Sequence, residues 1–356
     1  MDTFTTTDIP VGESPERLAI TPDGARLYVT HGVHASGGSF SDLAKTVSVI
    51  DTSTDTVIGS IQLEAHPNAI VMSPTGTRLF ASHMFDDLVS VIDTTTNTLA
   101  ATVPISGNPS LLCVTADGSR VYVTRAYEIS VIDATTYEVT QVLQTYPMGF
   151  GGIAVASDGG RLYATGGSHG SNILMVIDPI ATPPVSVDAI EMNSPQGVAL
   201  SADGSRCYVI DQGDALSWKN DIVVVDTKIG VGINAILRRL PGDVTPKRMY
   251  EHIAVDPTGA RIYVTDNSSQ DKVWVIDAPS DTVVTSFPLS EQAQDVAVRS
   301  TDPTIRHIYV SHWPSDKVSH TVSTTSASLT SGELLSYGDA GTPGNVSDPV
   351  TVGFGG

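Results

Sequence analysis

Histidine follows three of the predicted β-strands of this sequence at the point where each strand ends. His31 follows "LYVT", His83 follows "LFAS" and His312 follows "IYVS", and each run has the apolar–polar alternation typical of a strand. Three neutral imidazoles that meet at one place can bind Zn²⁺, Mn²⁺, Cu²⁺ or Fe²⁺ and leave a coordination position open for water or substrate. The pattern therefore suggests a divalent-metal site, provided that the fold brings these distant residues together.

An internal repeat predicts the fold that must position them. Each copy has two short strands joined at Asp-Gly, Thr-Gly or Gly-Gly, as in "LAITPDGARLYVT", and a third strand that ends near "VID". Such residue pairs permit the positive φ of a tight hairpin turn. Seven copies follow one another at intervals of roughly 40 to 55 residues, which is the spacing of propeller blades. Because one four-stranded sheet cannot bury its own faces, the copies must stack in a ring. The sequence thus predicts an all-β, seven-bladed β-propeller.

The predicted propeller spans residues 1–325 as one domain. Its blades are expected at about 15–66, 67–108, 109–150, 151–194, 195–251, 252–293 and 294–325. The N-terminal segment 3–11 has the pattern of the fourth strands, so we expect it to complete the last blade and close the ring. The Gly-, Ser- and Pro-rich segment 326–356 is predicted to be a C-terminal surface tail.

The amino-acid sequence of the repeat resembles that of the YVTN family of β-propellers. The likeness covers about residues 3–320 and depends on Tyr-Val-Thr at the end of the second strand, in Tyr28-Val29-Thr30, Tyr122-Val123-Thr124 and Tyr263-Val264-Thr265. The resemblance implies the propeller fold. It implies no single activity, because relatives include surface-layer proteins, quinone-enzyme subunits and lactonase-like enzymes. No catalytic motif of any one branch transfers to this sequence.

Aspartate recurs at the end of the third strand in six copies. These residues are Asp51, Asp93, Asp133, Asp178, Asp226 and Asp277. Recurrence in a repeat indicates a structural role, so we expect the carboxylates to accept backbone N–H bonds in turns.

One face of the predicted ring gathers most of the histidines. In a propeller, the loop between the second and third strands opens on the same face as the connection between blades, and ligand sites commonly lie there. Seven of the nine histidines fall in these segments: His31, His34, His66, His83, His169, His252 and His312. Blade seven adjoins blade one, so His312, His31 and His83 come from consecutive blades. We expect their imidazoles to converge near the axis, with His66 as a fourth ligand or a general base.

Two further interpretations of this histidine cluster stay open. The imidazoles can bind a substrate by hydrogen bonds without a metal, or they can line a solvated rim that has no function. Nothing in the sequence marks a nucleotide or flavin site, because it contains no phosphate-binding loop. It also lacks Gly-x-Ser-x-Gly, His-Glu-x-x-His and Cys-x-x-Cys.

The opposite arc of the same face offers acid–base groups. Asp211 and Asp266 follow the second strands of neighbouring blades, near Tyr250 and His252. Crowded carboxylates can raise a pKa for proton transfer or hold a cation; the alternative is that they cap turns. Arg125 can anchor an anionic group through its bidentate fork or can simply be solvated.

Composition excludes several classes of partner. The formal net charge of −20 and the isoelectric point near 4.5 argue against nucleic acid and anionic membrane surfaces. No apolar run is long enough to span a bilayer, and the N-terminus has no signal-peptide pattern. The chain as written is expected in the cytoplasm, or outside the cell if a leader was removed. Cys113 and Cys207 lie in predicted strands and are expected to be buried.

Together these patterns favour an enzyme that acts on a small molecule, with hydrolase, lyase or isomerase chemistry. His31, His83 and His312 would hold a metal or the substrate, Arg125 an anionic group, and Asp211, Asp266, Tyr250 or His252 would transfer protons. The rival hypothesis is a non-catalytic binding or scaffold propeller that uses the same face for a protein or cell-surface partner.

Overall fold

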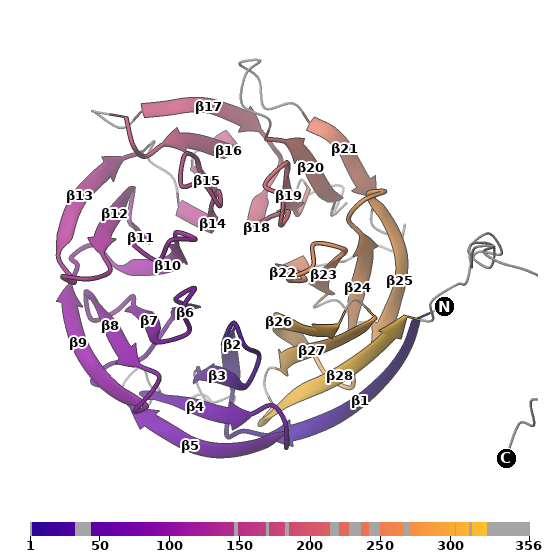
Figure 1. The fold of residues 1–356 in the computed structure, drawn as a ribbon. Helices are drawn as coiled ribbons and strands as arrows, with labels where there is room; N and C mark the ends of the chain where they lie inside the picture. The colour runs from indigo at the N-terminus through magenta and orange to yellow at the C-terminus, as the bar shows by residue number, and fades with distance from the viewer. Residues whose placement is uncertain are drawn as a thin grey trace, which may run out of the picture. The chain divides into compact units, whose positions relative to one another are not determined.

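The described part of the chain is a ring of seven sheets. The structure is a computed structural model that describes residues 2–32, 44–145, 149–168, 171–181, 185–213, 221–227, 236–241, 250–266, 271–302, 304–312 and 315–325. These residues form seven four-stranded sheets arranged around one axis (Figure 1). The all-β, seven-bladed propeller predicted from the repeat is thereby confirmed. Within these residues, no helix is long and apolar enough to cross a membrane.

Each blade consists of four antiparallel strands, which we name A to D from the axis outward. Blade 1 has β2 (Pro15–Ile20), β3 (Arg26–His31), β4 (Thr46–Asp51) and β5 (Thr56–Gln62). Blade 2 has β6 (Ala69–Met72), β7 (Arg78–His83), β8 (Leu88–Asp93) and β9 (Thr98–Pro104). Blade 3 has β10 (Pro109–Val114), β11 (Arg120–Arg125), β12 (Glu128–Asp133) and β13 (Val139–Gln144). Blade 4 has β14 (Gly149–Val155), β15 (Leu162–Ser168), β16 (Ser171–Asp178) and β17 (Val185–Glu191).

The remaining three blades complete the circle. Blade 5 has β18 (Pro195–Leu200), β19 (Arg206–Asp211), β20 (Asp221–Asp226) and β21 (Ile236–Pro241). Blade 6 has β22 (Tyr250–Val255), β23 (Arg261–Asp266), β24 (Lys272–Asp277) and β25 (Thr282–Pro288). Blade 7 has β26 (Ala293–Asp302), β27 (Ile305–His312), β28 (Lys317–Thr325) and, as its outermost strand, β1 (Asp2–Pro10).

The N-terminal strand closes the ring, as the sequence predicts. β1 pairs with β28 along its whole length, from Asp2 opposite Thr325 to Pro10 opposite Lys317. Met1–Thr325 form one compact unit. The predicted tail, 326–356, lies outside the described residues.

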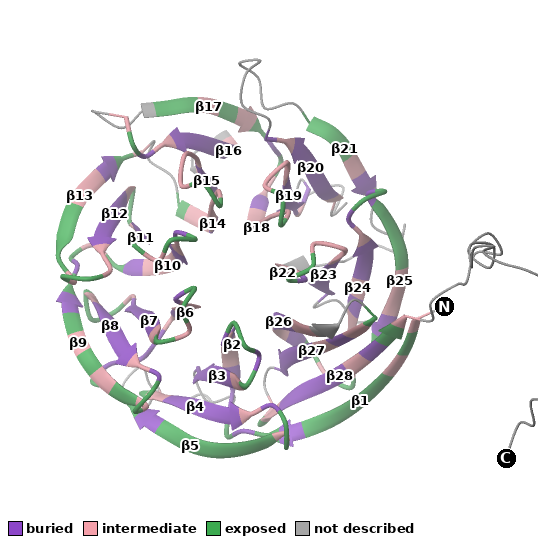
Figure 2. Ribbon diagram, viewed as in Figure 1, coloured by how far each residue is buried: buried purple, intermediate pink, exposed green. Residues whose placement is uncertain are grey.

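The hydrophobic core lies between neighbouring blades. Tyr28 and Val49 of blade 1, for example, belong to one buried cluster with Leu79 and Ile92 of blade 2. Figure 2 shows strands B and C largely buried, the A strands mostly of intermediate burial and the D strands largely exposed. Burial of apolar surface contributes roughly 25 cal/mol per Å², so each blade depends on its neighbours. Cys113 and Cys207 are both buried within this core, as expected.

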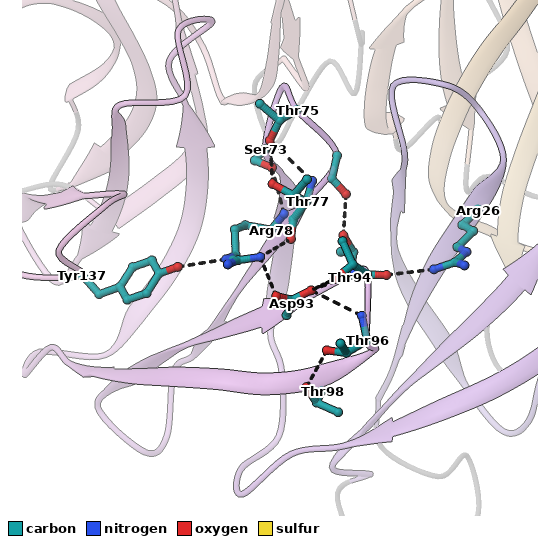
Figure 3. A network of polar contacts seen from close by, with 12 residues as sticks. Arg26, Ser73, Thr75, Thr77, Arg78, Asp93, Thr94, Thr96, Thr98 and Tyr137 are labelled. Atoms are coloured by element: carbon teal, nitrogen blue, oxygen red, sulfur yellow. Dashed lines mark hydrogen bonds and ion pairs between the residues drawn. The ribbon is translucent and has the colours of Figure 1, made fainter.

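The turns between strands C and D lie at the face opposite the B–C loops and link consecutive blades. Figure 3 shows Arg78 of blade 2, whose Nε donates to the Tyr137 hydroxyl of blade 3 at 2.9 Å and whose Nη1 reaches Asp93 at 2.8 Å. Arg26 of blade 1 donates to the Thr94 carbonyl of blade 2 at 2.8 Å. Arginine at the start of strand B therefore joins its blade to the next one.

The recurrent aspartates at the ends of strands C are turn-formers, as predicted. Asp51, Asp93 and Asp133 each accept the backbone N–H two residues further on at 2.8 Å. The side-chain hydrogen bond from Ser53 is the main reason that the pKa of Asp51 lies below its usual value. These carboxylates stabilise the turns and are not catalytic candidates.

Candidate functional site

The three histidines of the predicted metal site are the last residues of their B strands. His31, His83 and His312 end β3, β7 and β27, and each strand is paired up to or next to its histidine. They are 4%, 0% and 0% exposed. The sequence predicts these histidines in the loops between strands B and C, but in the structure each B strand extends one residue further and includes its histidine. Their side chains therefore lie within the packing of the blade.

Each of these imidazoles binds a serine of strand C in its own blade. The distances from Nε2 to the serine Oγ are 2.8 Å for His31 and Ser48, 2.8 Å for His83 and Ser90, and 2.7 Å for His312 and Ser319. The sequence motif for this pair is histidine at the end of strand B and serine as the third residue of strand C. The pair fastens two strands of one sheet to each other.

The other ring nitrogen of two of these histidines holds the connection that enters the blade. Nδ1 of His31 donates to the Glu13 carbonyl at 3.0 Å, and Nδ1 of His312 donates to the Glu291 carbonyl at 3.1 Å. Because a carbonyl oxygen only accepts, Nδ1 carries the proton in both rings. His66 likewise donates from Nδ1 to the Ala44 carbonyl at 3.0 Å. We name the strand-B-end position, with its bonds to strand C and to the D–A connection, the latch position.

The expected convergence of His31, His83 and His312 on one ion is not present. The described residues, which include these three and His66, contain no group of three or more His, Cys, Asp or Glu side chains that could hold a metal ion. The physical reason is that each imidazole is committed to hydrogen bonds within its own blade. Burial also lowers the pKa of His31 and of His83 to about 4, so both are neutral at pH 7.

Arg125 and Asp211 occupy the same latch position in blades 3 and 5. Arg125 Nη1 donates to the Ser106 carbonyl at 2.8 Å in the connection that enters blade 3. Asp211 is fully buried and accepts the Ser194 N–H at 2.7 Å in the connection that enters blade 5. It also forms an ion pair with Arg239 at 2.8 Å. Asp211 thus caps the connection, as in the alternative given for it, whereas Arg125 is bonded to the protein and not simply solvated.

Asp266 and Tyr250 belong to the first two strands of blade 6. Asp266 is buried and accepts the indole N–H of Trp274 at 3.1 Å. Tyr250 was expected in the connection but is the first residue of β22, where it pairs with Asp266. The side chain of Tyr250 lies outside the described part of the structure, as do His34 and His169.

A second ring of positions at the same face has a different character. The A strands, which lie closest to the axis (Figure 1), carry a register shift at their first residues in six of the seven blades. In blade 1 the shift lies between Pro15 and Leu18, and in blade 7 it lies between Ala293 and Val296. Such β-bulges redirect side chains and are frequent next to active sites. We name these residues the bulge position.

Hydroxyl groups of strand B hold the bulges in place. Thr30 Oγ1 accepts the N–H of Arg17 at 3.0 Å, and Thr265 Oγ1 accepts the N–H of His252 at 3.0 Å. Ser311 Oγ accepts the N–H of Asp295 at 3.0 Å and also donates to the Glu16 carbonyl of the next blade at 2.7 Å. The threonine of the Tyr-Val-Thr pattern thus has a structural task, which is to fix the bulge beside the axis.

Three bulge residues from consecutive blades meet at this face. Arg17 Nη1 of blade 1 contacts both ring nitrogens of His252 of blade 6, Nε2 and, at 3.2 Å, Nδ1. Nδ1 of His252 also lies 3.5 Å from Oδ1 of Asp295 of blade 7. The Asp295 carboxylate also accepts the backbone N–H groups of Leu18 and Val296, each at 2.8 Å. The fold thus places His252 of blade 6 against charged groups of blades 7 and 1. We name Arg17, His252 and Asp295 the bulge triad.

Burial sets the charge of this triad. Burial, assisted by the Arg17 charge, lowers the pKa of His252 well below its ordinary value, so its imidazole is neutral at pH 7. Burial raises the pKa of Asp295, and Arg17 together with the two backbone N–H groups opposes the rise. Burial also raises the pKa of the neighbouring Glu16. The arrangement combines a proton acceptor, a cation and carboxylates that take up protons more readily than usual.

The sequence carries a signal for the bulge position that periodicity alone misses. The residues that flank the bulge position are similar in every copy, whereas the residues at the bulge position differ in charge and size. Around the ring the position reads Glu16-Arg17, Asn68-Ala69, Ser110-Leu111, Gly151-Gly152, Gln196-Gly197, Glu251-His252 and Gln294-Asp295. Aligning the copies and asking where they disagree would have found Arg17 and Asp295.

Two grooves on the described surface lie at the turn face and not at the triad. One, of about 340 Å³, lies between blades 5 and 6 and is lined by Asp203, Arg206 and Thr258, among others. The other, of about 600 Å³, lies between blades 1 and 2 and includes Arg26 and Thr94 in its lining. Arg26 and Arg206 each donate a hydrogen bond to the neighbouring blade, so the two grooves are part of the contact between adjacent blades.

The fold is similar to propellers of known proteins. A chain of Kuenenia stuttgartiensis hydrazine synthase matches with a TM-score of 0.74 and 22% sequence identity over 90% of this chain and 97% of that chain. The Myceliophteria thermophila Cps50 (Swd1) β-propeller domain matches with a TM-score of 0.70 and 14% identity over 89% of this chain and 99% of that chain. No protein-family model matches the chain, and no curated protein is significantly similar to it. The likenesses show the β-propeller fold alone.

Proposed function

We propose that the protein is an enzyme that acts on a small molecule at the bulge triad, through acid–base chemistry of the hydrolase, lyase or isomerase type. One observation carries the proposal. The side chains of Arg17, His252 and Asp295 differ chemically and come from three blades, and His252 lies within 3.5 Å of each of the other two. Residues with a purely structural role recur from one copy of the repeat to the next, whereas the three residues of the bulge triad do not.

Each member of the triad has a distinct task in this proposal. His252, neutral at pH 7, accepts a proton from the substrate or from water. Asp295 lies beside Nδ1 of His252 and stabilises the imidazolium that forms. Arg17 has several N–H donors and binds the negative charge that develops on the substrate, or an anionic group that the substrate already carries. His31 and His312 have no role in it, because both ring nitrogens of each are used in hydrogen bonds, and His83 has none because it is fully buried with Nε2 bound to Ser90.

A binding or scaffold role is the second candidate. The D strands of neighbouring blades 5 and 6 expose apolar side chains, with Leu237 50% and Val284 47% exposed. Apolar residues on the outer surface of a ring can contact a protein partner. The two similar structures include an enzyme and a named β-propeller domain, and likeness at this level does not choose between the roles.

Turnover measured on matched variants tests the proposal. The purified protein is incubated with γ-lactones, hydroxycarboxylates and β-substituted amino acids, and products are followed by proton NMR. We expect conversion of one of these classes, reduced about 10² to 10⁴-fold in His252→Gln, which is the usual contribution of a general base. Arg125→Gln, at a latch position of the same face, is the control and should retain activity. Conversion that is equal in His252→Gln and in the wild type would overturn the assignment.

A further inference from the structure

The seam between blades 7 and 1 differs from the other seams in two residues. Strand B of the first six blades starts near an arginine, in the order Arg26, Arg78, Arg120, Arg161, Arg206 and Arg261. In blade 7 the equivalent residue is His307, which pairs with Val322 where Arg26 pairs with Asp51. An arginine, which is charged at all physiological pH values, is here replaced by histidine, whose ordinary pKa lies near neutral pH.

The second difference lies in the core of strand C. The residue opposite the strand-B aromatic ring is valine in the first six blades, namely Val49, Val91, Val131, Val176, Val224 and Val275. In blade 7 it is His320, opposite Tyr309 and only 5% exposed. The Tyr309 ring stacks on His320, with centroids 4.5 Å apart. A buried imidazole thus stands where the repeat buries an apolar side chain.

These two histidines form a hydrogen-bonded chain across the seam. Nδ1 of His307 lies 2.9 Å from Nε2 of His320, and Nδ1 of His320 lies 2.6 Å from Oδ2 of Asp55. Asp55 belongs to the C–D turn of blade 1, so the chain links the last blade to the first. Its backbone has a positive φ of 53°.

At other seams the residue equivalent to Asp55 in the C–D turn also links its blade to the preceding one, but it binds different side chains. Asn97 of blade 2 accepts the Tyr28 hydroxyl of blade 1 at 2.9 Å. Asp281 of blade 6 forms an ion pair with Arg206 of blade 5 at 2.6 Å. The tyrosine and the arginine at these two seams do not titrate between pH 4 and pH 8. At the seam between blades 7 and 1, the partner of the turn residue Asp55 is instead an imidazole, that of His320.

The groups that face the histidine pair come from four elements. Arg299 of β26 repels a proton on His307 and donates through Nη2 to the Thr52 carbonyl of blade 1 at 3.2 Å. Asp55 faces His320 from the C–D turn of blade 1, and Tyr309 covers it from β27. On the other side, β1 places Thr7 opposite His320. Asp55 is thus the anion that compensates the pair, and Arg299 is the cation that opposes its charging.

The facing nitrogens can accommodate one proton but not two. With one proton, Nδ1 of His307 and Nε2 of His320 form a donor–acceptor pair, and Nδ1–H of His320 binds Asp55. When both nitrogens carry a proton, two N–H groups meet head-on at a separation that is normal for a hydrogen bond. We infer that the seam between blades 7 and 1 is an acid-sensitive closure of the ring, stable while the facing nitrogens hold one proton and opened when each holds its own.

The titration of His307 gives the direction of the effect. Burial, with Arg299 and His320 adding to it, lowers the pKa of His307 from its ordinary value of 6.5 to about 4. The folded seam therefore binds fewer protons than the open chain between these two values. Its stability is present above pH 6.5 and is lost as the pH falls towards 4.

Hydrogen exchange of the native protein tests the inference. Amide protection is measured by mass spectrometry at pH 7.5 and pH 4.5, with correction for the intrinsic exchange rate, in 2–10 and 317–325 of the seam and in 120–133 of blade 3. We expect protection of the seam strands to fall at least about tenfold more than protection of blade 3 on acidification. An equal fall in both regions would overturn the proposal.

Two variants separate the histidine pair from other acid effects. His307→Arg with His320→Val restores the residues that the other six blades carry, and should remove the extra loss of seam protection at pH 4.5. His307→Arg alone keeps the buried His320 and provides a second test if the double variant does not fold; it too should reduce the difference between seam and blade 3. A seam that still opens selectively at pH 4.5 in these variants would show that the pair is not the acid-sensitive element.

Discussion

The latch and bulge positions lie at the same face of the ring and both carry histidine, but they differ in what surrounds the imidazole. At the latch, His31 and His312 are almost fully buried, and both ring nitrogens are bound within their own blade. At the bulge, His252 keeps 26% of its side chain exposed and faces Arg17 and Asp295 of two other blades. In a repeat protein, a residue that recurs builds the architecture, and a position where recurrence breaks is the place to look for function.

Removing the N-terminal strand should have the largest effect, because the blade 7 latch continues into it. Oγ of Ser319 lies 2.7 Å from Nε2 of His312 and 2.8 Å from Oδ1 of Asp8 in β1. Deletion of residues 1–10 removes nine residue pairs and leaves the outer edge of β28 without a partner strand. We expect the Tm to fall by more than about 10 °C, since this loss exceeds several kcal/mol, as measured by calorimetry. Deletion of 326–356 is the control; if both truncations melt at the parent temperature, β1 does not close the ring.

Removal of a latch imidazole should come next. His312→Ala leaves the Ser319 hydroxyl and the Glu291 carbonyl without that partner and creates a void in a fully buried place. We expect the free energy of unfolding to fall by about 2 to 4 kcal/mol. His252→Ala at the bulge should cost less than about 1 kcal/mol, because its site is partly open. Urea denaturation measures both values, and equal losses would mean that the two positions do not differ as the structure indicates.

Acidification should destabilise the ring through the latch positions. The pKa values of His31 and His83 are each lowered to about 4 from 6.5, so the unfolded chain binds more protons than the folded one between these values. The free energy of unfolding therefore falls as the pH falls from 6.5 to 4, by at most about 3 kcal/mol for each histidine. The urea midpoint at pH 7, 6, 5 and 4.5 follows this loss. In His83→Gln the slope should be shallower, and an unchanged slope would argue against a buried neutral imidazole there.

The sequence predicted the architecture well because the repeat records it directly. Asp-Gly pairs specify turns, and Gly118, for example, has the positive φ of 70° that such a turn requires. The recurrent aspartates indicated turns, and the pattern of segment 3–11 indicated the closing strand. Each of these signals is local, and each is repeated often enough to be distinguished from chance.

The site was predicted less well because it depends on where side chains point. Periodicity does not show that pairing includes His31, nor that its ring turns to Ser48 and not to the axis. A β-bulge leaves no fixed sequence pattern, so Arg17 and Asp295 were not recognised as site residues. His252 was among the predicted residues, but its partner Asp295 lies 43 positions away in the next blade. Its partner Arg17 lies 235 positions away and is brought near only by ring closure.

The smallest expected effect concerns the charge within the bulge triad. Arg17 disfavours a proton on His252, in addition to burial, which is the larger cause of the lowered pKa. Arg17→Gln removes that charge, so the pKa of His252 should rise towards its ordinary value yet remain below it, because burial persists. NMR titration of the histidine ring protons measures the shift, and His31, which is held at a latch by Glu13 and Ser48, supplies the internal control because its pKa should not move. A pKa of His252 that is the same with and without the guanidinium would mean that the two side chains do not face each other in solution, and the bulge position would then lose the electrostatic coupling that distinguishes it from the latch.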